Sequence, residues 1–167
     1  MGLGRVSGSG PRHVKLRRFS DRDAKATYDI FYAAVRKGTV AHYSQYEREA
    51  WAGSQTQPEN WLRRLNAQQT ILAEMEGRIV GFMSMKPDGF LDLAFVLPNV
   101  MGMGVAGRIY GALEDWAREN NLSTLRTHAS HLLRPFLIRR GWQVVKAQTV
   151  LSNGRRIENF QMEKLLA

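Results

Sequence analysis

Residues 91–107 (LDLAFVLPNVMGMGVAG) place an apolar segment before a glycine-rich turn, and residues with helical spacing follow. The pattern predicts a strand, a turn and the start of a helix. Glycines let the main chain approach a ligand closely, and the first N–H groups of a helix lack intrahelical partners and carry about half a positive charge. The sequence therefore predicts a phosphate-binding turn at this place.

Two familiar phosphate-binding patterns do not account for this turn. Residues 102–107 match G-x-G-x-x-G, the fingerprint of dinucleotide-binding folds. However, Pro98 and three further residues precede the first glycine, the next predicted strand offers no acidic residue for a ribose, and 60 residues follow Gly107. A P-loop would need Gly-Lys-Ser/Thr where residues 107–109 read GRI. An ordinary turn, with glycines that let a helix pack closely on a sheet, stays open as the non-functional alternative.

Hydrophobic periodicity and turn chemistry predict the remaining elements. Strands are expected at residues 14–19, 70–76, 78–86, 90–97, within 122–129, and at 142–151 and 155–165. Helices are expected at 24–37, from the capping box of Ser44 and Glu47 to Trp51, and at 59–67, 105–120 and 135–140. The order predicts an α/β fold of the α+β type in one domain over residues 12–167. Residues 1–11 are expected to form a flexible tail.

Composition excludes several classes of site. The chain has no cysteine, which excludes disulfides, thiolate metal sites and a cysteine nucleophile. The four histidines lack metal-ligand spacing, so no metal ion is expected. No segment has the length and apolar character of a membrane helix or a signal peptide, and a cytoplasmic location is expected. The net charge of +9 is concentrated in residues 1–40 and 134–167 and favours anionic ligands, although a solvated basic surface would account for it equally.

Two motifs carry a resemblance to a known family. Val96-Leu97-Pro98 ends a predicted strand, and residues 101–106 (MGMGVA) follow it. Residues 136–142 (FLIRRGW) lie further along the chain. They are similar to the Val-x-Pro, Gln/Arg-x-x-Gly-x-Gly/Ala and Phe-Tyr-x-x-x-Gly-Phe motifs of the GNAT superfamily of acyl-CoA-dependent N-acyltransferases, with Met101 in place of the polar first residue. A closer resemblance, to the YafP-like branch, rests on His42-Tyr43-Ser44, Ala50-Trp51-Ala52, Ala129-Ser130, Pro135-Phe136 and Asn159-Phe160.

The resemblance implies a GNAT fold and a cofactor. A central mixed, mostly antiparallel, twisted sheet is expected to splay near Phe95 and Val96, flanked by helices, with acetyl-CoA in the notch. The main chain of these two residues would pair with the pantetheine arm, and N–H groups from Gly102 to Ala106 would bind the pyrophosphate. The full set of expected cofactor-binding residues is Phe95, Val96, Met101, Gly102, Met103, Gly104, Val105, Ala106, Ser130, Phe136 and Arg139.

Acyl transfer from a thioester also needs a proton for the departing thiolate. In many family members a tyrosine supplies it from the Phe-Tyr motif, where this chain has Leu137. Tyr43 is the first candidate to replace that acid, and Ser130 is the second.

A general base must accept a proton from the attacking amine. Strand alternation predicts that Asp92 shares the apolar face of Ala94 and Val96, and such a setting would raise the pKa of its carboxyl group. An ion pair between Asp92 and a basic neighbour is the alternative. His42 is the rival base, with His128 and His131 as weaker candidates.

The resemblance also implies an acceptor site under the first two helices, to which Tyr43, Trp51 and Asn159 are expected to contribute. The predicted function is transfer of an acetyl group from acetyl-CoA to the amine of a small molecule or peptide, by direct attack in a ternary complex of a monomer or homodimer. A catalytically weak CoA-binding or RNA-interacting module, including a tRNA-acetylating toxin, is the alternative. Nucleic acid is less favoured because the basic segments lack interleaved aromatic residues.

Overall fold

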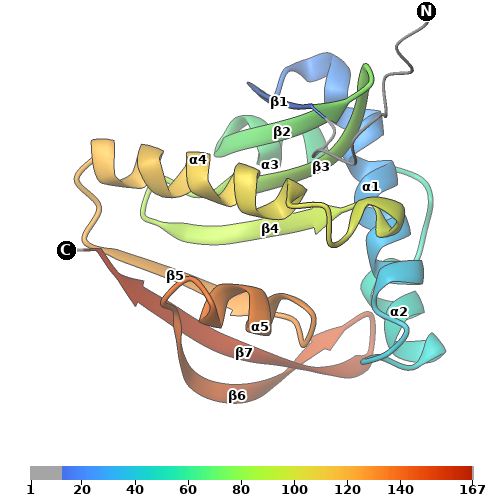
Figure 1. Ribbon diagram of the computed structural model, residues 1–167. Helices are drawn as coiled ribbons and strands as arrows, with labels where there is room; N and C mark the ends of the chain where they lie inside the picture. The colour runs from blue at the N-terminus through green and yellow to red at the C-terminus, as the bar shows by residue number, and fades with distance from the viewer. Residues whose placement is uncertain (1–12, 167) are drawn as a thin grey trace, which may run out of the picture.

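The computed structural model describes residues 13–166, so the expected tail at 1–11 lies outside the described residues. Figure 1 shows the strands arranged in one twisted sheet with the order β1-β2-β3-β4-β5-β7-β6. The pattern of apolar runs and turn residues predicted each of them to within a few residues. Their bounds are β1 (Val14–Arg18), β2 (Gln69–Met75), β3 (Arg78–Met85), β4 (Phe90–Val96), β5 (Thr124–Ala129), β6 (Gln143–Ser152) and β7 (Arg155–Leu165).

The sheet opens between β4 and β5. These two strands are parallel and are joined at only two positions, where Phe90 pairs with Arg126 and Leu91 with Thr127. All other neighbouring strands of the described sheet are antiparallel. Beyond Leu91 the two strands diverge, as Figure 1 shows, so the predicted splay of a mixed, mostly antiparallel sheet is confirmed.

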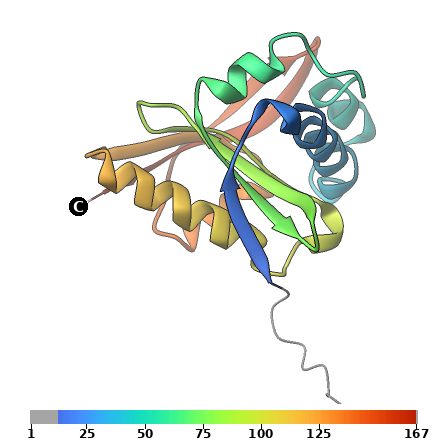
Figure 2. The same ribbon diagram turned by 90° about the horizontal axis from the view of Figure 1, so that it is seen from above.

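Helices cover both faces of the sheet, and Figure 2 shows α4 and α1 on opposite sides of the strands. The stripe Val105, Ile109, Leu113 and Ala117 on α4 is buried because residues four apart share one face of a helix. Among residues 13–166, no helix combines the length and the apolar character needed to cross a membrane. The helices are α1 (Ala24–Gly38), α2 (Gln45–Trp51), α3 (Trp61–Asn66), α4 (Val105–Glu119) and α5 (Leu133–Ile138).

A second apolar cluster fixes α1 and α3 on the face opposite α4. Trp61 of α3 is buried against Phe82 of β3 and Leu93 of β4. Its indole Nε1–H donates to the Thr27 hydroxyl of α1 at 3.1 Å, which satisfies the polar edge of a buried tryptophan. This packing fixes α1 and α3 against β3 and β4, next to the open seam.

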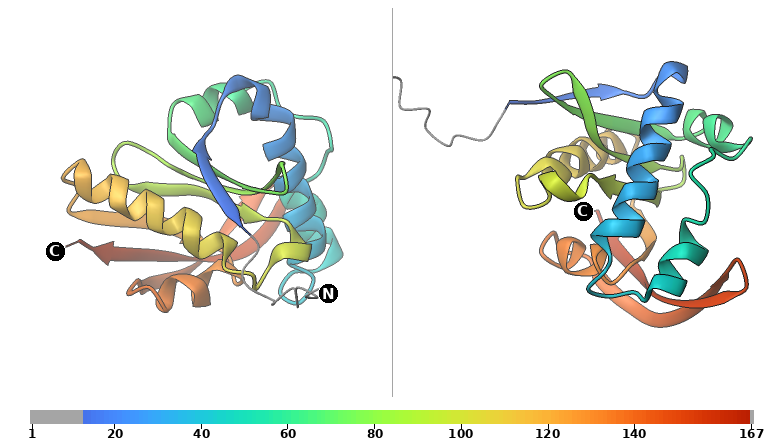
Figure 3. Two further views of the ribbon diagram at one scale, coloured as in Figure 1. Left: turned by 45° about the horizontal axis from the view of Figure 1, so that its top comes forward. Right: turned by 90° about the vertical axis from the view of Figure 1, so that its right-hand side faces the viewer.

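The tip of the β6–β7 hairpin is tied to α2. The predicted capping box begins α2, with the Glu47 N–H donating to the Ser44 hydroxyl and the Ser44 N–H to the Glu47 carboxylate. At the turn between β6 and β7, Asn153-Gly154 adopts the left-handed backbone that a tight hairpin requires. The Ser152 hydroxyl and the Asn153 amide both donate to the Ala50 carbonyl, at 3.1 and 2.7 Å. The right panel of Figure 3 shows the resulting approach of hairpin and helix.

Candidate active site

Strand β4 carries a β-bulge at Asp92. Leu93 pairs with Ser84 and Leu91 with Met85, so Asp92 is an extra residue relative to β3. A bulge interrupts the alternation of side chains between the two faces. Leu91 packs in the core beneath α4, whereas Leu93 packs against α1 and α3. Asp92 consequently faces α3.

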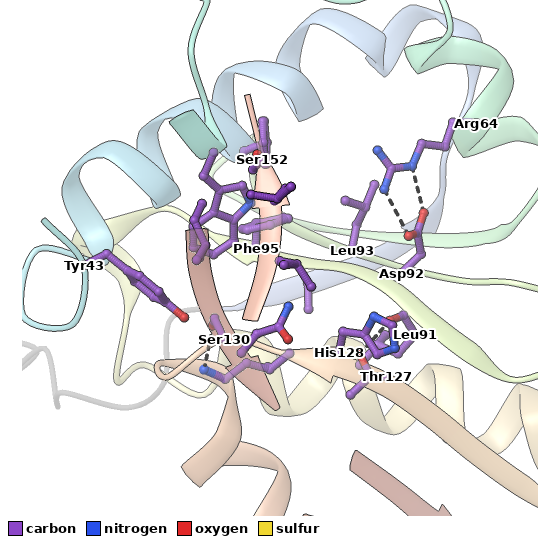
Figure 4. A pocket seen from close by; sticks show the side chains of 18 residues that line it. Tyr43, Arg64, Leu91, Asp92, Leu93, Phe95, Thr127, His128, Ser130 and Ser152 are labelled. Atoms are coloured by element: carbon purple, nitrogen blue, oxygen red, sulfur yellow. Dashed lines mark hydrogen bonds and ion pairs between the residues drawn. The ribbon is translucent and has the colours of Figure 1, made fainter. Parts of the chain in front are cut away.

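On this face Asp92 is held by two side chains of the α3 region. Arg64 donates from Nε and Nη2 at 2.8 and 3.0 Å (Figure 4). Gln68 donates from Nε2 at 2.8 Å. Burial alone would raise the pKa of Asp92, but these hydrogen bonds and the Arg64 charge outweigh it and lower the pKa. The predicted raised pKa of Asp92 and its predicted place beside Ala94 and Val96 are therefore wrong, because the bulge turns the carboxylate toward a cation.

The main chain of β4 presents polar groups to the open seam. The Leu97 N–H donates to the Val80 carbonyl of β3 at 2.8 Å, and N–H directions alternate along an antiparallel strand. Val96 and Ala94 therefore direct their N–H and C=O groups toward β5, where no strand of the described part of the chain pairs with them. Phe95 directs its N–H and C=O groups toward β3. This corrects the expectation that the main chain of Phe95 faces the notch. Its side chain reaches the cavities described below.

The glycine turn leaves open space in front of the first turn of α4. Gly102 and Gly104 have φ values of 82° and 81°, a left-handed conformation that favours glycine. A Cβ atom built on either glycine would meet no atom within 4 Å. Gly104 caps α4, so the N–H groups of Val105, Ala106 and Gly107 are first-turn donors without intrahelical partners. This geometry is that of an anion-binding helix start.

Two N–H groups of the same turn are already engaged. Met101 donates to the Pro98 carbonyl at 3.4 Å, and Met103 donates to the Val100 carbonyl at 3.2 Å. The Met103 N–H is therefore not among the donors offered to a ligand, contrary to the expectation for the whole segment. The Met101 side chain lines a cavity next to the turn, while the Met103 side chain is exposed.

Two cavities meet at the seam between β4 and β5. The first, of about 210 Å³, runs beside the glycine turn, and we call it the turn cavity; its lining includes Val96, Met101, Gly102, Ala106, Phe136 and Arg139. The second, of about 390 Å³, lies between α1, α2, β4, β5 and the β6–β7 hairpin, and we call it the hairpin cavity; its lining includes Tyr43, Asp92, His128, Ser130, Ser152 and Asn159 (Figure 4). Trp51, Ala94, Phe95, Ser130 and Leu133 line both.

Ser130 thus lies where the two cavities join. Its hydroxyl oxygen accepts the Leu133 N–H at 3.1 Å at the start of α5. A hydroxyl that accepts one hydrogen bond keeps its own proton free to donate. Ser130 is therefore the predicted residue whose geometry best suits proton donation at the junction.

Tyr43 is a buried wall residue of the hairpin cavity. Its hydroxyl accepts the His131 N–H at 3.0 Å and donates to the Glu158 carbonyl at 2.8 Å. Burial raises the pKa of the phenol, and Trp51 packs edge-on with its ring centroid 5.5 Å away. The hydroxyl proton of Tyr43 is already committed to the main chain of β7.

The histidines separate into two groups. His42 is exposed, stacks on His131 with ring centroids 5.8 Å apart and is absent from the lining of both cavities. His128 is exposed too, but it lines the hairpin cavity, as does Ser130, which follows the end of β5. From the sequence His128 is a weaker candidate, and its spacing of two residues from Ser130 was a signal that could have pointed to it. Within residues 13–166, no three His, Asp or Glu side chains are arranged to hold a metal ion.

Arg140 was not among the expected cofactor-binding residues, yet it lies beside the first turn of α4. Its guanidinium lies 3.6 Å from the ring centroid of Phe136, and Nη2 lies 2.7 Å from where a Cβ of Gly107 would be. A cation therefore rests against the first turn of α4, next to Arg139 in the turn cavity. In the sequence, the two consecutive arginines, Arg139 and Arg140, could have pointed to this cation.

Asn159 lies in the wall of the hairpin cavity, as expected. Its Oδ1 atom is buried and has no hydrogen-bond partner in the described part of the chain. Leaving a buried acceptor without a hydrogen bond costs about 1–3 kcal/mol of folding free energy, so a donor that bonded to this oxygen would be favourable.

The chain is similar in sequence and fold to known N-acetyltransferases. Residues 39–166 match the family model of the acetyltransferase (GNAT) domain. The chain is 31% identical over 150 residues to the uncharacterized N-acetyltransferase YafP of Escherichia coli (strain K12), covering 90% of this chain and 95% of that protein. A solved GCN5-related N-acetyltransferase of Rhodopseudomonas palustris is 33% identical, with a TM-score of 0.86 over 91% of this chain and 95% of that one.

A more distant structure shares the fold. The PaiA N-acetyltransferase of Thermoplasma acidophilum, solved in complex with coenzyme A, is 14% identical with a TM-score of 0.74, over 92% of this chain and 99% of that one. The family match covers most of the chain and includes the glycine turn, the seam and most of the residues that line the two cavities. The chain belongs to the GNAT family of N-acetyltransferases.

Proposed function

We propose that this protein transfers an acetyl group from acetyl-CoA to a primary amine by direct attack within a ternary complex. One observation carries the proposal: the turn cavity and the hairpin cavity share a wall at the open seam, so a donor and an acceptor could meet beside Ser130. The coenzyme A bound to the Thermoplasma acidophilum neighbour supports the choice of donor.

The residues of the turn cavity fit acetyl-CoA. The N–H groups of Val105, Ala106 and Gly107 would hold the pyrophosphate, with Arg139 and Arg140 supplying positive charge beside them. The free N–H and C=O groups of Ala94 and Val96 would pair with the amides of the pantetheine arm. Bound acetyl-CoA supplies the thioester whose acetyl group is transferred.

Ser130 is the proposed proton donor on the thiolate side. Leu137, at the position of the tyrosine acid in many family members, is fully buried in the core beneath α4 and carries no proton to give. The Tyr43 proton is committed to the Glu158 carbonyl, whereas the Ser130 proton is free at the junction. Tyr43 is instead proposed to shape the acceptor cavity together with Trp51.

His128 is the proposed proton acceptor for the amine. Asp92 is a poor base because Arg64 and Gln68 stabilise its ionised form and lower its pKa. His42 lies outside both cavities. Histidine is the side chain best suited to accept and release protons near neutral pH, and His128 faces the acceptor cavity. The amide of Asn159, rotated so that Oδ1 faces inward, would accept a hydrogen bond from the amine.

The test is release of free CoA thiol from acetyl-CoA in the presence of primary amines, followed by mass spectrometry of the product. The expected result is an amine heavier by one acetyl group, with CoA formed in equal amount. Tight binding of acetyl-CoA without amine-dependent CoA release would contradict the enzyme reaction. Such a result would favour a CoA-binding module.

A further inference from the structure

We infer that the acceptor is a small primary amine with an aromatic or bulky apolar body and a single positive charge. This inference deepens the proposed function and rests on it. It comes from the walls, the charge and the size of the hairpin cavity.

Aromatic rings form one continuous part of the wall, beside polar residues such as Thr127, His128 and Asn159. Phe31 and Phe95 lie with ring centroids 5.0 Å apart, and Trp51 lies 6.1 Å from Phe95. These three rings form one connected surface, on which an apolar body can be buried. The apolar side chains of the lining include Phe31, Trp51, Leu93, Phe95, Val150 and Ile157.

The cavity offers no free negative charge. Among its described lining residues, Asp92 is the only carboxylate, and it is already paired in two hydrogen bonds with Arg64. A polyamine or an aminoglycoside carries several ammonium groups, and each one buried without a carboxylate is costly. An amine with one ammonium group pays this cost once, and burial against the aromatic part of the wall would lower the pKa of that group, which favours the neutral, attacking form.

The size also limits the acceptor. A volume of about 390 Å³ is near the lower end of the range for small-molecule sites. On one side the cavity is bounded by the β6–β7 hairpin, whose tip is tied to the Ala50 carbonyl by Ser152 and Asn153. One ring with a short amine-bearing chain matches this volume, whereas most of an oligosaccharide would have to lie outside the cavity.

The experiment compares four amines in the CoA-release assay: 2-phenylethylamine, spermidine, kanamycin and a tripeptide with a free N-terminus. We expect kcat/KM for 2-phenylethylamine to exceed that of each of the others about tenfold or more. Equal or better turnover of any other amine overturns the substrate class and leaves the proposed function standing. No CoA release with any of the four, while acetyl-CoA binds, contradicts the proposed function itself and this inference with it.

A matched pair of variants tests the charge argument. Val150 lines the cavity from β6, and Thr149, its neighbour on the same strand, is exposed and outside the lining. Val150→Glu should raise the ratio of kcat/KM for spermidine to that for 2-phenylethylamine about tenfold, because it adds a carboxylate without a partner. Thr149→Glu should leave the ratio unchanged. An equal ratio in both variants would contradict selection by cavity charge, and KM for acetyl-CoA reports whether the fold is intact.

Discussion

Arg64 and Asp92 form a two-pronged ion pair in the wall of the hairpin cavity, with Nε to Oδ2 at 2.8 Å and Nη2 to Oδ1 at 3.0 Å. The Asp92 side chain is 11% exposed and that of Arg64 is 41% exposed. The planar guanidinium fixes the carboxylate in one orientation and keeps it ionised. The positive charge of Arg64 thereby balances the negative charge of Asp92 in the cavity wall.

Loss of Arg64 should destabilise the fold. Arg64→Gln leaves the largely buried Asp92 carboxylate with Gln68 as its remaining side-chain hydrogen-bond donor, and we expect a loss of about 1–3 kcal/mol in the free energy of unfolding at pH 7. Urea unfolding measures this. Lys25→Gln, which removes an exposed ion pair with Asp29, should cost under about 0.5 kcal/mol. Equal losses in the two variants would contradict a structural role for the Arg64–Asp92 pair.

Asp23 should make stability depend on acidic pH. Arg17 donates to both carboxylate oxygens at 2.7 and 2.8 Å, and with Ser20 it outweighs burial and lowers the pKa of Asp23 from 3.8 to about 2. A lowered folded-state pKa stabilises the protein at neutral pH, and this contribution is lost as the pH falls from about 4 to about 2. The stability gap between wild type and Asp23→Asn should therefore shrink by about 2 kcal/mol between pH 7 and pH 2. Urea titrations at both pH values check this, and a constant gap would refute it.

A carboxylate at the glycine turn should strongly weaken acetyl-CoA binding. Gly104→Asp places negative charge in the open space before the first N–H groups of α4, where a phosphate is proposed to bind. Gly77→Asp is the matched control, because Gly77 has φ 76° and equally open surroundings but lies at the β2–β3 turn. Calorimetry should show a loss of affinity of more than about tenfold only for Gly104→Asp. Retained affinity would remove the turn from the cofactor site.

Removing the Ser130 hydroxyl should lower activity, whereas removing the Tyr43 hydroxyl should lower stability. Ser130→Ala should lower kcat by about tenfold to a hundredfold with little change in KM for acetyl-CoA, because a proton donor is lost at the junction. Tyr43→Phe leaves the His131 N–H and the Glu158 carbonyl without this partner and should cost about 1–3 kcal/mol of stability. Steady-state kinetics and thermal unfolding separate the two. A larger kcat loss in Tyr43→Phe would return Tyr43 to the role of acid.

His128 should control the acid side of the pH–rate profile. His128→Gln removes the proposed proton acceptor, so the fall in kcat/KM toward low pH should flatten and the rate at pH 7 should drop. His42→Gln, outside both cavities, should leave the profile unchanged. Profiles of kcat/KM from pH 5 to pH 9 provide the comparison. Identical profiles for wild type and His128→Gln would exclude His128 as the base.

The sequence by itself determined the elements and the glycine turn, because their causes are local. Period-two and period-3.6 apolar patterns predicted the strands and helices, and the capping box of Ser44 and Glu47 formed as expected. The left-handed Gly102 and Gly104 and the hairpin at Asn153-Gly154 depend on residue types that tolerate such a backbone. The resemblance to the family likewise rested on local motifs, Val96-Leu97-Pro98 with residues 101–106 and the segment 136–142.

Only the tertiary structure decided the side chains of the candidate site, because their partners are distant in the chain. The bulge at Asp92 arises from pairing with β3, and it turns the carboxylate toward Arg64, 28 residues away. The Tyr43 hydroxyl binds the Glu158 carbonyl across 115 residues, which commits its proton. The alternation of residues along one strand does not predict a β-bulge, because the bulge depends on the partner strand. No local pattern predicts which of the two hydroxyl groups, Tyr43 or Ser130, keeps a free proton.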